Sequence, residues 1–365
     1  MNQHPESVSL SSEDSRANLF WVDLLRAAVI FGVIVIHTAA DVITEWGALP
    51  KDWWWAANIY DSLVRGCVPV FVMVSGALLL PKTETLRDFF RKRFHRIAIP
   101  FIVWTALYLI WKKLFYLPNM GLAEAFSRAA ENKVCFHLWF LYIIAGLYLV
   151  TPVFRILIAH ASGREIFYFL ALWFVMSSLL PFAEDLSRVF TQTGFQIQLP
   201  VEPVKGFIGY FVLGYFLWKY AAGKFTAPAC AVWITSLTLC AAGTYFLSRH
   251  FHSYQGLLYD NMAPNVVFYA ASFFMLVTTA GPFLEKHLAP RLRELILLLS
   301  KASFGIYLIH PMILDTLIHG RLGFALRPNM PHPVFMIPLV TGIVYLLSFL
   351  AIFLIQKIPR LRNIV

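Results

Sequence analysis

Charged residues are scarce in this sequence. Asp, Glu, Lys and Arg together make up 14% of the 365 residues, whereas 59% of the residues are hydrophobic. In a soluble globular domain about a quarter of all residues are charged. The composition therefore excludes an ordinary soluble enzyme or binding module. Instead, apolar runs of about 20 residues recur along the chain, and this is the length that a helix needs to cross a bilayer. The sequence predicts an all-α, polytopic integral membrane protein.

Two further features are missing, and each absence argues against a class of protein. The four cysteines (Cys67, Cys135, Cys230 and Cys240) show no metal-ligand spacing, which predicts buried free thiols and no metal site. The sequence also shows no internal repeat and no second soluble domain. Many secondary transporters contain repeats with broken helices at matching positions, so the lack of a repeat weighs against transport.

The polar segment 1–17 lacks the basic start of a cleaved signal peptide, and the apolar run after it is too long for the core of one. We expect residues 1–17 to form a disordered cytoplasmic tail, residues 18–356 a single transmembrane domain, and residues 357–365 a basic cytoplasmic tail. The net charge of +10 does not indicate nucleic acid as a partner, because Lys and Arg mostly set topology in a membrane protein.

Hydropathy predicts about ten transmembrane helices, and loop charge predicts their orientation. The expected spans are 18–40, 59–80, 97–116, 138–159, 165–181, 206–221, 228–247, 265–284, 295–318 and 334–356. The loop after the second span and the C-terminal tail are rich in Lys and Arg, which places them and both termini in the cytoplasm. The loop before the second span is acidic and contains Trp53, Trp54 and Trp55, which are typical of a membrane–water boundary.

The first span contains three ionisable residues, Asp23, Arg26 and His37. Asp23 and Arg26 are three residues apart and therefore neighbours on one helix face. Arg26 and His37 are eleven apart, which at about 100° per residue is three turns plus about 20°, so they share that face about 16 Å apart along the axis. Residues of this kind inside a membrane usually mark a functional path. The spacing favours one long ligand, or two levels of one channel, over a compact catalytic pair.

Simpler structural interpretations remain open for these residues. Asp23 and Arg26 could form an interfacial salt bridge, with His37 as an interhelical hydrogen-bonding group. Ser75 and Gly76 could serve close helix packing. The basic loop before the third span could act only as a topology signal, although Arg93 and Arg96, three apart, could also grip a phosphate together.

Two more histidines are expected in the outer half of the membrane. His137 precedes the fourth span, and His310 lies past the middle of the ninth. A single histidine of this kind is more often structural than catalytic. Three histidines at similar depth on separate helices, with His37 as the third, favour a shared site in the outer leaflet.

Four motifs in order along the chain resemble those of the acyltransferase-3 family of membrane acyltransferases. They are "DLLRAAVIFGVIVIH" with Arg26 and His37, "FVMVSGALLL" with Ser75, "RKRFHRIAIPFIVW" with Arg93, Arg96 and Pro100, and "SFGIYLIHP" with Tyr307, His310 and Pro311. Each motif is loose by itself, but the combination is specific. The segment "HLWFLYIIAGLYLVTP" is similar to the enterobacterial common antigen O-acetyltransferase type.

The resemblance implies transfer of an acyl group, typically acetyl, from acyl-CoA to a hydroxyl of a cell-envelope or lipid-linked glycan. On this basis we expect Arg93 and Arg96 to hold CoA phosphates, and Arg26 to guide the pantetheine arm, with Asp23 orienting Arg26. Ser75 is assigned to the donor side as well. His37 is the expected general base, since a neutral imidazole near pH 7 suits that role.

The expected acceptor side comprises His137, Trp139, Tyr307 and His310. Acetyl-CoA is then the donor co-substrate, with no metal, and the location is the bacterial inner membrane. The competing interpretation is a secondary transporter or exporter with a polar path. A binding scaffold is a third option, which leaves the intramembrane charges unexplained.

Overall fold

The computed structural model describes residues 19–191 and 205–365, and the tail expected at 1–17 lies outside these residues. The described residues form helices and no strands. The α-helices are α2 (Phe20–Ile43), α3 (Lys51–Val64), α4 (Cys67–Leu79), α5 (Leu86–Arg93), α6 (Ile99–Phe115), α7 (Leu122–Ala130), α8 (Trp139–His160), α9 (Gly163–Phe174), α10 (Leu180–Thr191), α11 (Ile208–Tyr220), α12 (Thr226–Thr238), α13 (Thr244–Phe251), α14 (Pro264–His287), α15 (Pro290–Ile318) and α16 (Pro333–Lys357).

Nine helical stretches among the described residues are long and apolar enough to cross a membrane. Several of them join two α-helices through a π-helical turn, namely η1 (Phe94–Ala98), η2 (Val175–Leu179) and η4 (Leu239–Gly243). The all-α, polytopic membrane architecture is therefore confirmed. The span expected at 206–221 is α11, which has 13 residues. A helix of that length extends only about 20 Å, less than the hydrocarbon core of a bilayer.

The second span also differs from expectation. Trp53–Trp55, expected in a loop, lie in α3, so the helical stretch begins at Lys51. The stretch is broken at Arg65–Gly66, where α3 ends and α4 begins. Gly66 packs directly on the ring of Tyr269: a Cβ there would lie 2.2 Å from a ring carbon.

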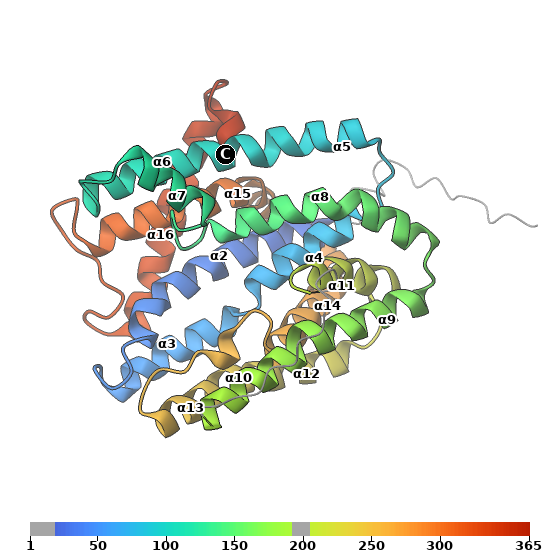
Figure 1. Ribbon diagram of the computed structural model, residues 1–365, viewed down its shortest axis with the longest axis horizontal. Coiled ribbons are helices and arrows are strands. Elements are labelled where there is room, and N and C mark those ends of the chain that lie inside the picture. Colours follow the sequence, from blue (N-terminus) through green and yellow to red (C-terminus); the bar gives the residue numbers. More distant parts are fainter. Residues whose placement is uncertain (1–18, 192–204) are drawn as a thin grey trace, which may run out of the picture.

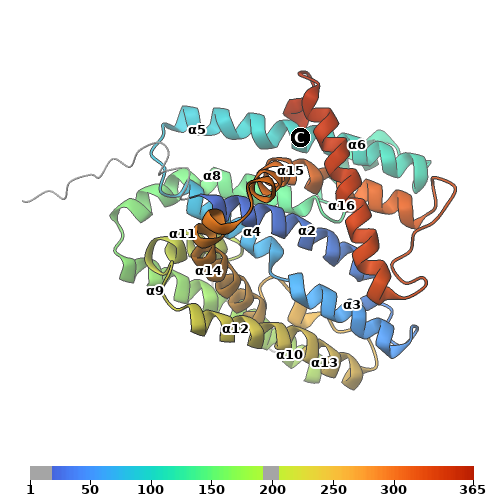
Figure 2. The same ribbon diagram turned by 180° about the vertical axis from the view of Figure 1, so that it is seen from behind.

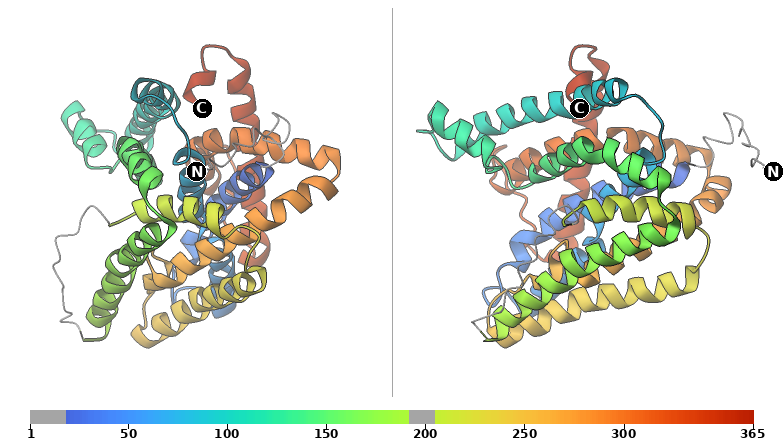
Figure 3. Two further views of the ribbon diagram at one scale, coloured as in Figure 1. Left: turned by 90° about the vertical axis from the view of Figure 1, so that its right-hand side faces the viewer. Right: turned by 45° about the vertical axis from the view of Figure 1, so that its right-hand side comes forward.

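Helix α2 occupies the middle of the bundle, where it packs against α3, α4, α14, α15 and α16 (Figure 1). Seen from behind, α16 crosses the α2–α15 pair (Figure 2). The joined α5–η1–α6 helix runs along one side of the bundle, and the C-terminal segment lies beside it (Figure 3). There Trp104 donates a hydrogen bond to the carbonyl of Ile364 at 2.8 Å. Asp23, Arg26 and His37, the ionisable residues of the first span, therefore lie on a helix that five other helices enclose.

Helices α4 and α11 are in backbone contact. A Cβ added to Gly76 would lie 1.7 Å from the Phe211 carbonyl oxygen, and one added to Gly214 would lie 2.0 Å from the Met73 carbonyl oxygen. Because neither backbone can move aside like a flexible side chain, both positions require glycine. Close approach through small residues is a common way for helices to associate in membranes.

We predict that Gly76→Ala destabilises the protein by about 1–3 kcal/mol or more, because the added methyl group forces α4 and α11 apart. Thermal unfolding in detergent measures the effect. Gly146→Ala is the matched control: Gly146 lies in α8 with open space around its Cβ position, and alanine there favours the helix. Equal unfolding temperatures for the two variants would contradict the close-packing interpretation.

Candidate active site

A cavity of about 540 Å³ lies at the start of α2. It contains every residue expected on the donor side of the site: Asp23, Arg26, Ser75, Arg93 and Arg96. These residues come from α2, α4, α5 and η1, so the fold brings four segments together around one space. We call this space the cationic cavity.

The arginines of the cationic cavity differ in their partners. Arg93 pairs with Glu84, with Nη2 and Oε1 3.1 Å apart. Arg26 and Arg96 form no ion pair and no hydrogen bond with any residue that the structure describes. Two cationic groups in one cavity with no ion-pair partner among the described residues indicate a site for an anionic ligand.

Asp23 does not pair with Arg26. Its Oδ1 accepts a hydrogen bond from the Ser300 hydroxyl of α15 at 2.5 Å, and within the described residues no ion pair closer than 4.0 Å joins it to Arg26. The simple salt bridge considered from the sequence is therefore absent, and Arg26 remains available to a ligand. Ser75 likewise makes a local bond, donating to the Phe71 carbonyl at 3.0 Å.

The wide turn η1 contains Arg96. In a π-helix, successive side chains are rotated differently from those of an α-helix, so the three-residue spacing of Arg93 and Arg96 does not place them as an α-helix would. Both side chains nevertheless line the cationic cavity. Single π-helical turns are frequent at functional sites.

Glu84 organises the positive groups at the edge of the cationic cavity. Its carboxylate pairs with Lys92 at 3.0 Å, Arg93 at 3.1 Å and Arg155 at 3.0 Å. Burial alone raises the pKa of Glu84, but hydrogen bonds from Lys92 and Arg155 and the charge of Arg93 outweigh it and lower the pKa to about 2. The guanidinium groups of Arg93 and Arg155 each lie 4.7 Å from the ring centroid of Phe89. Glu84 and Phe89 therefore hold both arginines in place.

Three histidines meet farther along the bundle. The rings of His37 on α2 and His310 on α15 stack with their centroids 5.4 Å apart and their planes 20° apart. His137, just before α8, meets His310 at 5.6 Å. His137 and His310 are almost completely buried. The structure thus brings together the three histidines that the sequence placed at similar depth, and we call them the histidine cluster.

Pro311 sets the hydrogen bonding of His310. Because proline has no N–H, the carbonyl of Tyr307, four residues earlier, loses its helical partner. His310 Nδ1 lies 2.8 Å from this oxygen and 3.2 Å from the carbonyl oxygen of Ile306. A carbonyl only accepts, so Nδ1 carries the hydrogen and Nε2 holds a lone pair. Nε2 is buried without a partner among the described residues, which leaves it able to accept a proton.

An aromatic layer separates the histidine cluster from the cationic cavity. The Phe140 ring lines the cavity and lies 5.8 Å from Phe71 and 5.5 Å from Tyr307, centroid to centroid. Tyr307 in turn lies 5.2 Å from His137, and its hydroxyl donates to the His137 carbonyl. No histidine of the cluster lines the cationic cavity. The site therefore consists of one cavity and a buried histidine cluster on the other side of the aromatic layer.

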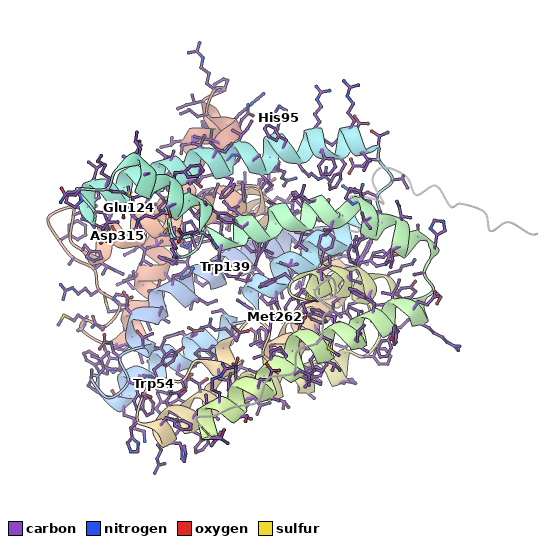
Figure 4. The ribbon with its side chains drawn as sticks, in the orientation of Figure 1. Trp54, His95, Glu124, Trp139, Met262 and Asp315 are labelled. Carbon is purple, nitrogen blue, oxygen red and sulfur yellow. The ribbon has the colours of Figure 1, made fainter. Side chains whose placement is uncertain are left out.

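Trp139 stands apart from the other residues expected on the acceptor side. It begins α8 (Figure 4), and its ring packs on Phe207 at 5.6 Å and Phe140 at 6.3 Å. No ring contact between Trp139 and a histidine of the cluster occurs among the described residues. Trp139 thus contacts the cluster only through Phe140.

Sequence reasoning missed two groups of charged residues. Arg65 Nη2 lies 2.7 Å from Oδ1 and 2.8 Å from Oδ2 of Asp61, and the guanidinium lies 4.4 Å from the Tyr259 ring. The spacing of this buried pair, four residues apart on one helix face, was visible in the sequence. The bond between Glu84 and Arg155 was not visible, because the two residues are 71 positions apart.

Comparison with known proteins gives one finding for this chain. The acyltransferase-3 family model, described as an acyltransferase domain, matches residues 19–355. No curated protein and no solved structure matches. The matched range includes every residue of the cationic cavity and the histidine cluster.

We predict that Glu84→Gln lowers the unfolding temperature at neutral pH, because Arg93 and Arg155 lose their shared counter-charge. The depressed pKa of Glu84 fixes the pH dependence: its contribution is complete above about pH 5 and is lost as the pH falls toward 2. The difference in unfolding temperature between wild type and variant should be constant from pH 7 to about 5 and shrink below.

Glu124→Gln is the control for this experiment. Glu124 pairs with Arg128 at 2.8 Å, but both side chains are substantially exposed, and such pairs contribute little to stability. If the difference in unfolding temperature between wild type and Glu84→Gln does not change between pH 5 and pH 3, the stabilising role assigned to the ionised Glu84 is contradicted.

Proposed function

Because this chain belongs to the acyltransferase-3 family, we propose that it is a membrane-bound O-acyltransferase. It moves an acyl group, in the first instance acetyl, from cytoplasmic acyl-CoA to a hydroxyl of a cell-envelope carbohydrate or lipid-linked glycan. The observation that carries the proposal is the position of the cationic cavity and the histidine cluster along one central helix, α2, with Nε2 of both His137 and His310 unpartnered among the described residues.

The cationic cavity is the proposed donor site. CoA is a long polyanion, and Arg93 and Arg96 are the proposed ligands of its phosphates. Arg26, which has no protein partner, guides the pantetheine arm, and Ser75 lines the same space. Asp23 acts on Arg26 through its charge rather than through contact, since its own hydrogen bond goes to Ser300.

His37 is the proposed general base. It takes the proton of the acceptor hydroxyl as the oxygen attacks the thioester carbonyl carbon. When the C–S bond breaks, the imidazolium of His37 gives this proton to the departing CoA thiolate. His37 is then neutral for the next cycle. The Phe140 side of the aromatic layer must admit the thioester, because the cationic cavity ends there.

The acceptor side comprises His137, Trp139, Tyr307 and His310 in this proposal. Two features support the assignment: the unpartnered Nε2 atoms of His137 and His310, and the contact of His310 with His37. A sugar hydroxyl can donate to a bare imidazole nitrogen. Trp139 would act at a greater distance, through its contact with Phe140.

Membrane location and topology complete the proposal. The nine candidate spans make the chain a multi-pass membrane protein, and the bacterial inner membrane is the proposed location. Both termini are cytoplasmic in this proposal, which counts α11 as a tenth crossing of the membrane. The basic residues around the cationic cavity then face cytoplasmic acyl-CoA. Enterobacterial common antigen or a related glycan is the proposed class of acceptor.

We predict that His37→Gln lowers acyl transfer by at least about 10²-fold, the typical contribution of a general base, and leaves acetyl-CoA affinity unchanged. Membrane vesicles supplied with labelled acetyl-CoA and glycan acceptor measure the transfer. Wild-type transfer by this variant would disprove the mechanism. Unmodified acceptor accumulating inside wild-type vesicles, without labelled glycan, would instead support a transporter.

His310→Asn tests the acceptor side separately. The asparagine amide can still donate to the Tyr307 carbonyl, but no atom replaces Nε2. We expect the acceptor KM to rise or kcat to fall by about tenfold or more, with acetyl-CoA affinity retained. Unchanged acceptor kinetics in steady-state assays would remove His310 from the site.

A further inference from the structure

A second cavity, of about 1460 Å³, adjoins the cationic cavity. The two share Leu19 and Lys82, and Glu84 lines the larger one. The walls of the larger cavity come from loop 80–85, the last turns of α8 and the end of α11. We infer that it binds the phosphorylated nucleotide end of the acyl donor, an inference that rests on the proposed function.

The sizes of the two cavities support this division. Acyl-CoA consists of a thioester on a long pantetheine arm, a diphosphate, and an adenosine carrying a 3′-phosphate. The cationic cavity, at about 540 Å³, falls in the range of pockets for compact, drug-sized molecules. It suits the thioester and the arm, with the diphosphate at Arg93 and Arg96. The larger adjoining space is where the remaining nucleotide can be placed without crossing protein.

Arg155 gives the larger cavity a defined phosphate ligand. Its Nε donates to the Leu79 carbonyl at 2.9 Å, and its Nη2 donates to Glu84 at 3.0 Å. A guanidinium has five N–H groups, so these two bonds fix its orientation and leave the remaining donors for a ligand. A guanidinium held in this way is suited to bind a phosphate through two parallel hydrogen bonds.

Further cations surround the same space. Lys82 and Lys219 line the cavity, and Lys219 is held by the Tyr215 hydroxyl at 2.8 Å. Glu84 supplies one negative charge against Lys92, Arg93 and Arg155, so the cluster keeps a net positive charge. Glu84 therefore aligns the arginines without neutralising the site.

The cavity also offers an aromatic surface for a base. Trp218 lines it and is partly exposed, and the ring of Trp21 supports Trp218 from behind, at 6.2 Å between centroids. Stacking on an aromatic ring is a general way for proteins to bind a nucleobase. A phosphate ligand and an aromatic surface in one cavity together match a nucleotide better than an inorganic anion.

A phosphate ester could also come from the headgroup of an anionic lipid. Continuity with the cationic cavity favours the nucleotide, because a single acyl-CoA can then occupy both spaces. The experiment must separate these two sources.

The test uses the full-length protein in nanodiscs of neutral lipid, with the affinities of acetyl-CoA and 3′-dephospho-acetyl-CoA measured for each variant. We expect wild type to bind acetyl-CoA about tenfold more tightly than 3′-dephospho-acetyl-CoA, because the analogue lacks the charge-assisted contact to the 3′-phosphate. In Arg155→Gln this preference should disappear, so that the ratio of the two affinities is about one. The affinity for 3′-dephospho-acetyl-CoA should stay near that of wild type.

Lys219→Gln is the second variant, because Lys219 does not contact Glu84 and its loss leaves the Arg155 geometry intact. A reduced preference for the 3′-phosphate is expected there as well. Lys224→Gln is the control: Lys224 is exposed, bonds to the Tyr220 carbonyl and does not line the cavity. It should keep the tenfold preference.

The outcomes distinguish the two proposals. If wild type binds acetyl-CoA but neither Arg155→Gln nor Lys219→Gln changes the preference, the nucleotide subsite is wrong and the proposed function stands. If wild type neither binds acetyl-CoA nor transfers acetyl groups, the proposed function fails, and the subsite fails with it. If anionic lipid added to the nanodiscs binds through Arg155 while the 3′-phosphate preference persists in Arg155→Gln, the cavity is a lipid site and the inference is overturned.

Discussion

Polar groups inside a bilayer must find their partners within the protein, because lipid offers none. Several intramembrane polar groups obey this constraint: Asp23 accepts from Ser300, Asp61 pairs with Arg65, and Tyr108 donates to the Leu308 carbonyl. At the site the constraint is relaxed. Arg26 has no ion-pair partner, and Nε2 of His310 has no hydrogen-bond partner, among the described residues. A ligand is the natural source of the missing partners.

The electrostatic arrangement of the cationic cavity is built before any ligand arrives. Glu84 and Phe89 fix Arg93 and Arg155, while η1 carries Arg96 toward the same space. Charged groups that are already oriented need little rearrangement when an anion binds, and such preorganisation is a major source of both affinity and catalytic power. The histidine cluster has a different feature, a proline that frees one carbonyl and thereby fixes one imidazole tautomer.

Patterns local in the sequence predicted much of this architecture. The apolar runs located the membrane helices, because a run of about 20 apolar residues matches the thickness of a bilayer. They also predicted a span at α11, whose 13 residues are shorter than the hydrocarbon core of a bilayer. Arg26 and Arg96, both expected on the donor side, line one cavity, and His37 contacts His310, which was expected at a similar depth.

Other features depended on packing between distant segments. The break at Arg65–Gly66 and the backbone contact at Gly76 follow from which helices meet there, and no local pattern contains that information. The same holds for the Glu84–Arg155 pair, whose partners lie in loop 80–85 and in α8. Asp23 likewise accepts a hydrogen bond from Ser300 on a distant helix and not from Arg26, the partner that helix geometry favoured.

The aromatic layer of Phe71, Phe140 and Tyr307 has a consequence beyond the site. Compartments that hold charges and imidazoles are hydrophilic, and two of them in line across a membrane would form a conduit for ions and protons. The packed rings between the cationic cavity and the histidine cluster interrupt that line. In an energised membrane, packed rings of this kind keep a cationic cavity from becoming a leak for ions and protons.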